Sequence, residues 1–158
     1  MKIGDMNLEV VDEMKLLRVI VRSDLTWKSN TDNMIKKAYA RLWILRGLGV
    51  LGANMSEMLD IYKSQVRSML EFAVPVWAGY ITKKEKVKIE RVQKCALSII
   101  LKEKYHSYQQ ALDYTKLELL EDRRQLQTLK FAKKALKHKK FANWFEIQLN
   151  CVNTRSKK

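Results

Sequence analysis

Cysteine is scarce in this sequence, and its scarcity excludes two kinds of site. There are only two cysteines, Cys95 and Cys151, and neither belongs to a Cys-x-x-Cys motif or lies near a histidine at ligand spacing. A structural zinc site needs four such ligands, so we expect none here. Two cysteines also provide no disulfide framework, which favours an intracellular compartment, either cytoplasm or nucleus. Cys95 falls on the apolar side of a predicted helix, where we expect a reduced core residue.

Long apolar runs are also lacking. The longest uncharged stretch, residues 72–82, is far shorter than the ~20 residues that a membrane-spanning helix needs. The first residues do not form the apolar run of a secretory signal. We therefore expect no membrane span.

Motifs that carry enzyme chemistry are missing as well. No glycine-rich phosphate loop, His-Glu-x-x-His or Gly-x-Ser-x-Gly motif occurs. His106 and His138 lie in basic, polar segments without a partner at useful spacing, so we expect surface residues. The adjacent acids at 121–122 are expected in the first turn of a helix, where carboxylates interact favourably with the helix dipole, and not in a two-metal site. We expect no catalytic residue, no metal and no cofactor.

Positive charge and apolar residues are abundant by contrast. The 158 residues are 47% hydrophobic, enough for one domain with a core, and include 31 Lys and Arg against 17 Asp and Glu, a net charge of +14. This excess favours an anionic partner, nucleic acid first and a membrane surface second. The charge is clustered: residues 83–104 hold eight basic and three acidic residues, and residues 123–140 hold eight basic and no acidic ones.

The spacing of apolar residues predicts a mainly α fold, a small array of about five helices with an N-terminal β-hairpin. The β-branched runs 7–11 and 16–21 predict the two strands, joined by the acidic link at 12–13. The first helix is expected to end at Gly47 and Gly49, where glycine suits a helix stop.

Capping patterns predict where the remaining helices begin. The residue pairs with this spacing are Asn54 with Glu57, Thr82 with Glu85, and Ser107 with Gln110. Pro75, the only proline, is expected to close or kink the helix that follows Asn54. The last helix, residues 118–137, is predicted to be the longest.

The basic clusters fall on faces of two predicted helices. At about 100° per residue, four cations of the helix at 118–137 project within one narrow arc, opposite an apolar side of Leu129, Ala132 and Leu136. The helix after Thr82 has a weaker cationic side of the same kind. Two cationic ridges on neighbouring helices suit a phosphate backbone, the main source of sequence-independent affinity. The candidate nucleic-acid-binding residues are Lys84, Lys88, Arg91, Lys94, Arg123, Arg124, Lys130, Lys134 and Lys137.

Other uses of these faces stay open. An ordinary solvated face is disfavoured because a row of cations without interspersed acids incurs repulsion between residues four apart. A basic amphipathic helix also suits an anionic membrane or a calmodulin-type partner. Four aromatic residues lie on or beside apolar helix faces, and for each of them we expect core packing over stacking on bases. They are Tyr39, Trp43, Tyr62 and Trp77.

Segments across most of the chain occur in an order and spacing that together are typical of one protein family. They are Lys15-Leu16-Leu17-Arg18-Val19 with Leu25-Thr26-Trp27; Lys37-Ala38 with Leu42, Leu45-Arg46 and Leu48; Tyr62, Val66-Arg67-Ser68, Leu70-Glu71 and Pro75-Val76-Trp77; Ile89-Glu90-Arg91-Val92-Gln93-Lys94 with Tyr105 and Tyr108; and Leu120-Glu121 before Arg123-Arg124, then Trp144-Phe145 and Asn153-Thr154-Arg155-Ser156-Lys157. With these segments the chain resembles the C-terminal, thumb-side end of a reverse transcriptase from a non-LTR retrotransposon of the LINE or jockey type.

The resemblance implies three regions: residues 1–26 as the residual palm-end β-hairpin, 27–140 as a thumb-like helical domain, and 141–158 as an aromatic and then basic tail. In such polymerases the thumb helices hold the template–primer duplex, while palm aspartates without a counterpart here perform the chemistry. The implied partners are an RNA or RNA–DNA duplex and the palm domain of the parent polymerase, and the chain is not an enzyme by itself. The chain departs from the family pattern at three positions. Arg18 stands where the family has glycine, Arg22 where it often has aspartate, and Asn30 where histidine is usual.

Two rival interpretations remain at the level of sequence. A co-opted helical module that binds a protein predicts an exposed apolar patch, around Trp77 and Tyr80, where the palm would have packed. A non-functional remnant of the element predicts a poorly folded chain, because an isolated two-stranded hairpin is marginal in water. The oligomeric state is open.

Overall fold

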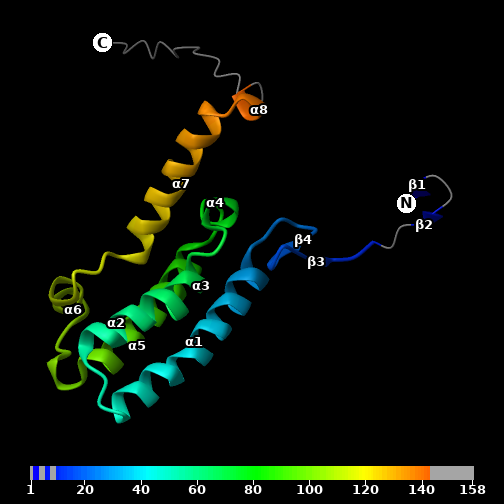
Figure 1. Cartoon of the computed structure of the whole chain (residues 1–158). Helices are drawn as coiled ribbons and strands as arrows, with labels where there is room; N and C mark the ends of the chain where they lie inside the picture. Colours follow the sequence, from blue (N-terminus) through cyan, green and yellow to red (C-terminus); the bar gives the residue numbers. More distant parts are fainter. Residues whose placement is uncertain (1, 4–5, 8–9, 143–158) are drawn as a thin grey trace, which may run out of the picture.

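The computed structural model describes residues 2–3, 6–7 and 10–142 of the chain, and it shows a helical bundle with a hairpin at its N-terminal edge (Figure 1). This confirms the predicted fold class, mainly α with an N-terminal β-hairpin. The strands are β1 (Lys2–Ile3), β2 (Met6–Asn7), β3 (Glu13–Leu16) and β4 (Val19–Arg22). The helices are α1 (Lys28–Val50), α2 (Met55–Ile61), the π-helix η1 (Tyr62–Arg67), α3 (Ser68–Leu70), α4 (Val74–Trp77), α5 (Lys83–Leu101), the 3-10 helix η2 (Lys102–Lys104), α6 (Tyr108–Thr115), α7 (Leu120–Lys137) and α8 (Lys139–Ala142). Most of the predicted tail, residues 143–158, lies outside the described residues.

The hairpin that packs on the bundle has a different register from the predicted one. Strands β3 and β4 pair antiparallel from Glu13 with Arg22 to Leu16 with Val19, so the acidic residue expected in the link belongs to a strand. The turn consists of Leu17 and Arg18, both with positive φ, 46° and 71°. Such two-residue turns match the right-handed twist of the flanking strands, which explains why the chain accepts the strain.

Polar contacts from one end of α1 fasten the hairpin to the helices. The Asn30 side chain, almost fully buried, accepts a hydrogen bond of 3.1 Å from the Ile20 backbone N–H through Oδ1. The Glu13 carboxylate accepts from Ser29 Oγ at 2.5 Å and from Arg22 Nη1 at 2.7 Å. These contacts, with buried Val19, join β3 and β4 to the start of α1.

Helix α1 is longer than the glycines suggested. It has 23 residues and continues through Gly47 and Gly49 to Val50, and it is longer than α7, which has 18. Gly52, with φ of 81°, is the glycine that adopts the left-handed conformation just past the end. The predictions that α1 ends at the first two glycines and that the last helix is the longest are therefore wrong.

Pro75 has a different role from the predicted one. The helical segment that begins at the Asn54–Glu57 capping box, which the structure confirms, runs through α2, η1 and α3 and ends at Leu70. Ala73, with φ of 52°, reverses the chain, and Pro75 then lies in the first turn of the short helix α4. A proline fits there because the first backbone N–H groups of a helix have no intrahelical partner.

The later helices begin where the capping patterns predicted. Thr82 and Glu85 form a capping box at the start of α5, and the Ser107 side chain accepts from the Gln110 N–H at the start of α6. Helix α7 begins at Leu120 with Glu121 and Asp122 in its first turn, as expected from the helix dipole.

The core lies between α1, the α2–α3 segment and α5, and most of its members come from these elements. Tyr62 and Trp77 are fully buried in it, as predicted. Tyr39 and Trp43 are 40% and 67% exposed, so the prediction that they pack in the core is wrong. They lie outside the buried face of α1, which is centred on Ala38 and Leu42.

A buried polar network crosses the interior near α5, α6 and α7. Gln93 accepts from the Tyr62 hydroxyl at 2.5 Å, and its Nε2 donates to the Tyr108 hydroxyl at 2.9 Å and to the Glu118 carbonyl at 3.0 Å. The Tyr108 hydroxyl donates to Glu90. Burial raises the pKa values of both tyrosines above their usual value. The network is satisfied, so it fixes how these helices dock.

Candidate nucleic-acid interface

The predicted cations of α5 divide between different sides of the helix. Lys84, Lys88 and Arg91 are exposed along the edge that faces α1, and Lys88 Nζ lies 2.8 Å from Asp32 of α1. Lys94 points elsewhere, with its ammonium 4.8 Å from the centre of the Tyr108 ring on α6. The first three therefore form a row that continues the outer surface of α1.

The two predicted ridges do not run side by side. Lys86 pairs with Glu121 of α7 at 2.7 Å, whereas Lys88 pairs with α1. Residues two apart on a helix project roughly 200° apart, so α1 and α7 flank α5 on opposite edges. Lys130, Lys134 and Lys137 are exposed on the part of α7 that extends past α4 and away from α2 and α6 (Figure 1). The row on α5 and the row on α7 thus lie on different sides of the molecule.

Arg123 and Arg124 were both predicted to bind nucleic acid, but Arg123 is ion-paired within the fold and Arg124 is buried. The Arg123 guanidinium meets Glu71 through Nε at 2.5 Å and Nη2 at 3.1 Å, and Glu118 through Nη1 at 3.1 Å. Arg124 is only 3% exposed. Burial lowers its pKa, against the opposing effect of Glu90 and other nearby acids. Both guanidinium groups are therefore less accessible to a phosphate than the exposed lysines of the same helix.

The expectation that the apolar side of α7 packs is also wrong for much of the helix. Leu129 is 58% exposed and Leu136 is exposed too, because the second half of α7 leaves the bundle. Only Leu120 and Arg124 of this helix are buried. The buried face of α7 is thus the one that carries Leu120 and Arg124, and not the predicted apolar side.

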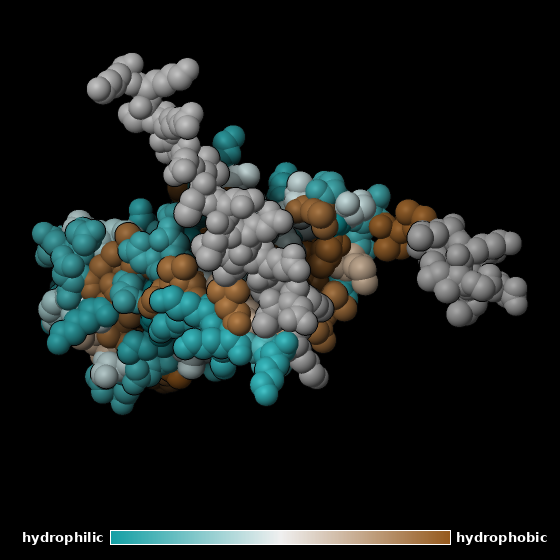
Figure 2. Space-filling view, turned by 90° about the horizontal axis from the view of Figure 1, so that it is seen from above, coloured by the Kyte–Doolittle hydropathy of each residue, from teal (hydrophilic) through white to brown (hydrophobic). Residues whose placement is uncertain are grey.

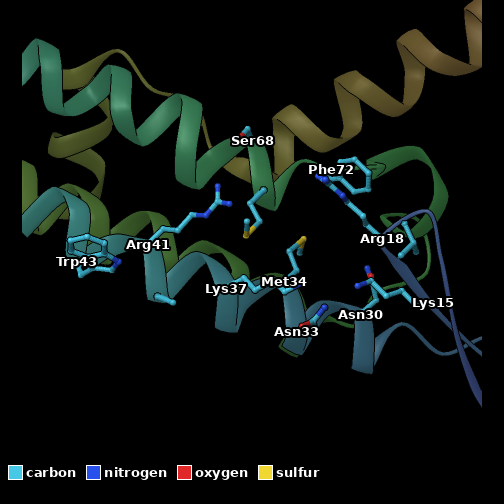
Figure 3. A pocket seen from close by; sticks show the side chains of 13 residues that line it. Lys15, Arg18, Asn30, Asn33, Met34, Lys37, Arg41, Trp43, Ser68 and Phe72 are labelled. Atoms are coloured by element: carbon cyan, nitrogen blue, oxygen red, sulfur yellow. The ribbon is translucent and has the colours of Figure 1, made fainter.

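A groove of about 730 Å³ that the sequence did not predict lies between the hairpin, α1 and the α3 segment (Figure 3). Its lining combines cations, amides, methionines and aromatic rings. The lining residues are Lys15, Arg18, Val19, Asn30, Asn33, Met34, Lys37, Ala40, Arg41, Trp43, Ser68, Met69 and Phe72. Four cations thus face one concave surface.

One signal in the sequence pointed to part of this groove. Asn30, Asn33, Lys37 and Arg41 recur at spacings of three and four, so they share one face of α1. This face of α1 is polar, yet it faces the hairpin and the α3 segment and not open solvent alone. The contributions from β3, the Leu17–Arg18 turn and Phe72 are distant in sequence, and only the fold brings them to α1.

The groove is cationic because the neighbouring acids are engaged elsewhere. No Asp or Glu is among the lining residues. Glu13, close in sequence to the hairpin cation Lys15, is held by Ser29 and Arg22. Glu71, next to Phe72, is held by Arg123. Arg41 is positioned by a 2.8 Å hydrogen bond from Nη1 to the Gln65 carbonyl of η1.

An exposed apolar patch lies on the hairpin side of the molecule, where Figure 2 shows hydrophobic residues gathered on the right. The exposed apolar residues of the hairpin and its flanking segments are Val10, Val11, Met14, Leu16, Leu17 and Leu25. The patch was predicted around Trp77 and Tyr80. Trp77 is buried instead, and its indole N–H donates to the Phe72 carbonyl at 2.8 Å, while Tyr80 is exposed.

Within the described part of the chain, no group of three His, Cys, Asp or Glu side chains is arranged to hold a metal ion. Nor does any of its helices combine the length and apolar character needed to cross a membrane. His106 is exposed, and the His138 ring lies 5.2 Å from that of Phe141. Cys95 is half-buried against the core. Comparison with protein-family models, curated proteins and solved structures gives no match for this chain.

Proposed function

We propose that this chain binds nucleic acid through a basic face formed by α5 and the adjoining edge of α1. The observation that supports this most is the clustering of exposed cations there, with Asp32 of α1 already paired to Lys88. Lys36 of α1 lies about 100° from Lys37 around the helix, between the groove and the row on α5. A face of this kind neutralises several backbone phosphates at once, and the released counterions supply the affinity.

A duplex is the form of nucleic acid that suits the row on α5. Lys84, Lys88 and Arg91 recur along one edge of the helix, so they follow a backbone and do not surround a point. Contacts of this kind carry no base information, and we expect little sequence preference and a dissociation constant on the order of micromolar. The row on α7 would add contacts only if the nucleic acid is long enough to reach that helix as well. Its residues are Lys130, Lys134 and Lys137.

We also infer the evolutionary origin of the chain from the family that its sequence motifs resemble. The chain would be the thumb-side fragment of a non-LTR retrotransposon reverse transcriptase, with RNA or RNA–DNA duplex as its ligand and no catalysis of its own. The exposed apolar patch at the hairpin supports this proposal, since the hairpin is where a palm domain would pack. The turn at Arg18, with φ of 71°, gives a physical reason for the glycine of the family pattern.

Replacement of the row on α5 tests this function. The triple variant Lys84→Ala, Lys88→Ala, Arg91→Ala is compared with a triple that removes the same charge elsewhere, Lys63→Ala, Lys104→Ala, Lys116→Ala. The ligand is an RNA–DNA duplex, and binding is measured by fluorescence anisotropy. We expect the α5 triple to weaken binding at least tenfold more than the control, because each lost phosphate contact removes counterion release. Equal losses would contradict the proposed face.

The exposed apolar patch also supports a second candidate, a module that binds a protein. Surfaces of contiguous apolar residues on soluble proteins commonly mark partner sites. This candidate predicts that Leu16→Ser and Leu17→Ser abolish partner capture while duplex binding is unchanged. A poorly folded remnant is excluded if the chain melts cooperatively by circular dichroism.

A further inference from the structure

We propose that the groove between the hairpin, α1 and α3 binds a single-stranded segment of nucleic acid, with bases stacked on Trp43 and Phe72. This inference rests on the proposed function and assigns a second, distinct site to it. The α5 row lies on the edge of α1 away from the groove. The two sites can therefore be tested separately.

The ends of the groove present two aromatic rings. Trp43 lies at one end, and Phe72 lies near Arg18 at the other (Figure 3). Trp43 is 67% exposed and Phe72 is 45% exposed, although both belong to a chain with a well-filled core. Stacking of unpaired bases on aromatic rings is a main source of affinity for single strands and tolerates any sequence.

Cations lie between and beside these rings. Lys37 and Arg41 project from α1 along the floor, and Lys15 and Arg18 approach from the hairpin. An anionic backbone that passes from one ring to the other meets these charges on the way. The combination of a cationic track with aromatic platforms is the arrangement that single-strand-binding grooves use.

The observations favour a single strand over the other anionic occupants. A duplex hides the faces of its bases, so it would leave Trp43 and Phe72 unused. An acidic peptide would match the charges, but it has no planar rings to cover the two aromatics. The volume of about 730 Å³ falls within the range of sites for small ligands and short segments.

The test compares variants on a fluorescently labelled oligothymidylate, measured alone and as the duplex with its complement. Trp43→Ala removes a platform, Trp43→Phe keeps one, and Lys37→Glu reverses a groove charge. Lys133→Glu is the matched control, because it makes the same charge change at an exposed position in the middle of another helix, α7, outside the groove lining. All four changes are at exposed side chains, and circular dichroism confirms that each variant is folded.

We expect Trp43→Ala to weaken binding of the single strand about tenfold and Trp43→Phe to weaken it much less, in line with measured base–aromatic stacking. Lys37→Glu is expected to weaken single-strand binding about tenfold more than Lys133→Glu does. Duplex binding by Trp43→Ala stays within twofold of wild type. Quenching of tryptophan fluorescence by the single strand disappears in the same variant.

Three results would overturn this inference. Equal effects of Trp43→Ala on single strand and duplex, or no effect on either, would show that the ring does not stack on bases while the proposed duplex face still stands. Displacement of the oligothymidylate by polyglutamate at equal charge concentration would assign the groove to an acidic peptide. Absence of binding to both nucleic acids would remove the proposed function together with the inference.

Discussion

Arg123 of α7 and Glu71, the residue that follows α3, form a two-pronged ion pair across 52 positions of the sequence. Nε and Nη2 of the guanidinium meet the two carboxylate oxygens at 2.5 and 3.1 Å, and both side chains are largely buried. The pair raises the pKa of Arg123 above its usual value, with Glu71 the main cause. It fixes α7 against the loop that leads to α4.

Replacement of Arg123 by methionine is expected to destabilise the fold. It leaves the Glu71 carboxylate without its donors in a partly buried site, and hydrogen bonds to charged groups contribute about 1.5–3 kcal/mol each. We expect a loss of about 2 kcal/mol in the free energy of unfolding, measured by urea titration. Duplex affinity should stay unchanged at a temperature where the variant is folded. A large loss of affinity without loss of stability would restore Arg123 to the binding residues.

The neighbouring substitution Arg124→Met is expected to have the opposite effect on stability. Among the described residues, neither Nη1 nor Nη2 of Arg124 has a hydrogen-bond partner, although the side chain is almost fully buried. The nearby carboxylates have other donors. Glu90 accepts from the Tyr108 hydroxyl and the Leu120 N–H, and Glu121 accepts from Lys86. An apolar side chain of similar length therefore removes a buried guanidinium whose N–H groups lack hydrogen-bond partners, and we expect a gain of about 1 kcal/mol. A loss as large as that of Arg123→Met would show that the guanidinium has partners in solution.

The strained turn of the hairpin gives a third prediction. Arg18 has φ of 71°, and a residue with a Cβ in the left-handed region costs about 1–2 kcal/mol relative to glycine. Arg18→Gly removes this strain but gives the unfolded chain more freedom, so we expect a net gain of less than about 1 kcal/mol. The gain is measured as slower hydrogen exchange of the Ile20 amide, because a more stable hairpin opens less often. Faster exchange would mean that the Arg18 side chain itself holds the turn.

The polar network around Gln93 predicts a sensitive interior. Gln93→Leu keeps the volume but removes the acceptor of the Tyr62 hydroxyl and the donor to the Glu118 carbonyl. Buried polar groups left without partners cost about 1–3 kcal/mol each, so we expect a loss of several kcal/mol. The double variant with Tyr62→Phe should recover part of it, because the orphaned hydroxyl is gone. Additive losses in the double variant would show that the two side chains are not coupled.

Acid is expected to loosen the hairpin. Hydrogen bonds from Ser29 and then Arg22 hold the pKa of Glu13 below its usual 4.5. The Thr26 backbone N–H, followed by Arg22 and the Thr26 hydroxyl, lowers the pKa of Asp24 from 3.8 to about 2.

Both carboxyl groups bind protons less readily when folded, so their stabilising contribution is complete above pH 4.5 and is lost as the pH falls toward about 2. Amide exchange at Ile20 and Arg22 against pH measures this. In the Glu13→Gln variant, hairpin protection should be lost over a narrower pH range, because only Asp24 then titrates. Protection of the hairpin that is constant over the whole range would contradict the assignment.

Local features of this fold were predictable from the sequence, because they depend on residues a few positions apart. The capping residues Asn54, Thr82 and Ser107 begin helices as expected, since each satisfies backbone N–H groups of its own first turn. The hairpin register was not predictable in this way. Its turn uses Leu17 and Arg18, residue types that disfavour positive φ, and the strands are held in that register by Asn30 and Ser29 of α1.

The candidate sites depended still more on tertiary structure. The periodicity of α7 predicted that its apolar side packs, but it did not show where the helix leaves the bundle. Arg124, which was expected at the surface, is therefore buried, and Leu129, which was expected to pack, is exposed. The groove escaped prediction because Lys15, Lys37 and Phe72 come from three separate segments.

The measurement that tests the central claim most directly is the salt dependence of duplex binding by the unmodified chain. The logarithm of the association constant for an RNA–DNA duplex is plotted against the logarithm of the salt concentration. If about four phosphates are neutralised, the slope is about −3.6 and affinity falls about a hundredfold for a fourfold rise in salt. A slope near zero, or no binding at low salt, would contradict the account of the basic face as a nucleic-acid interface.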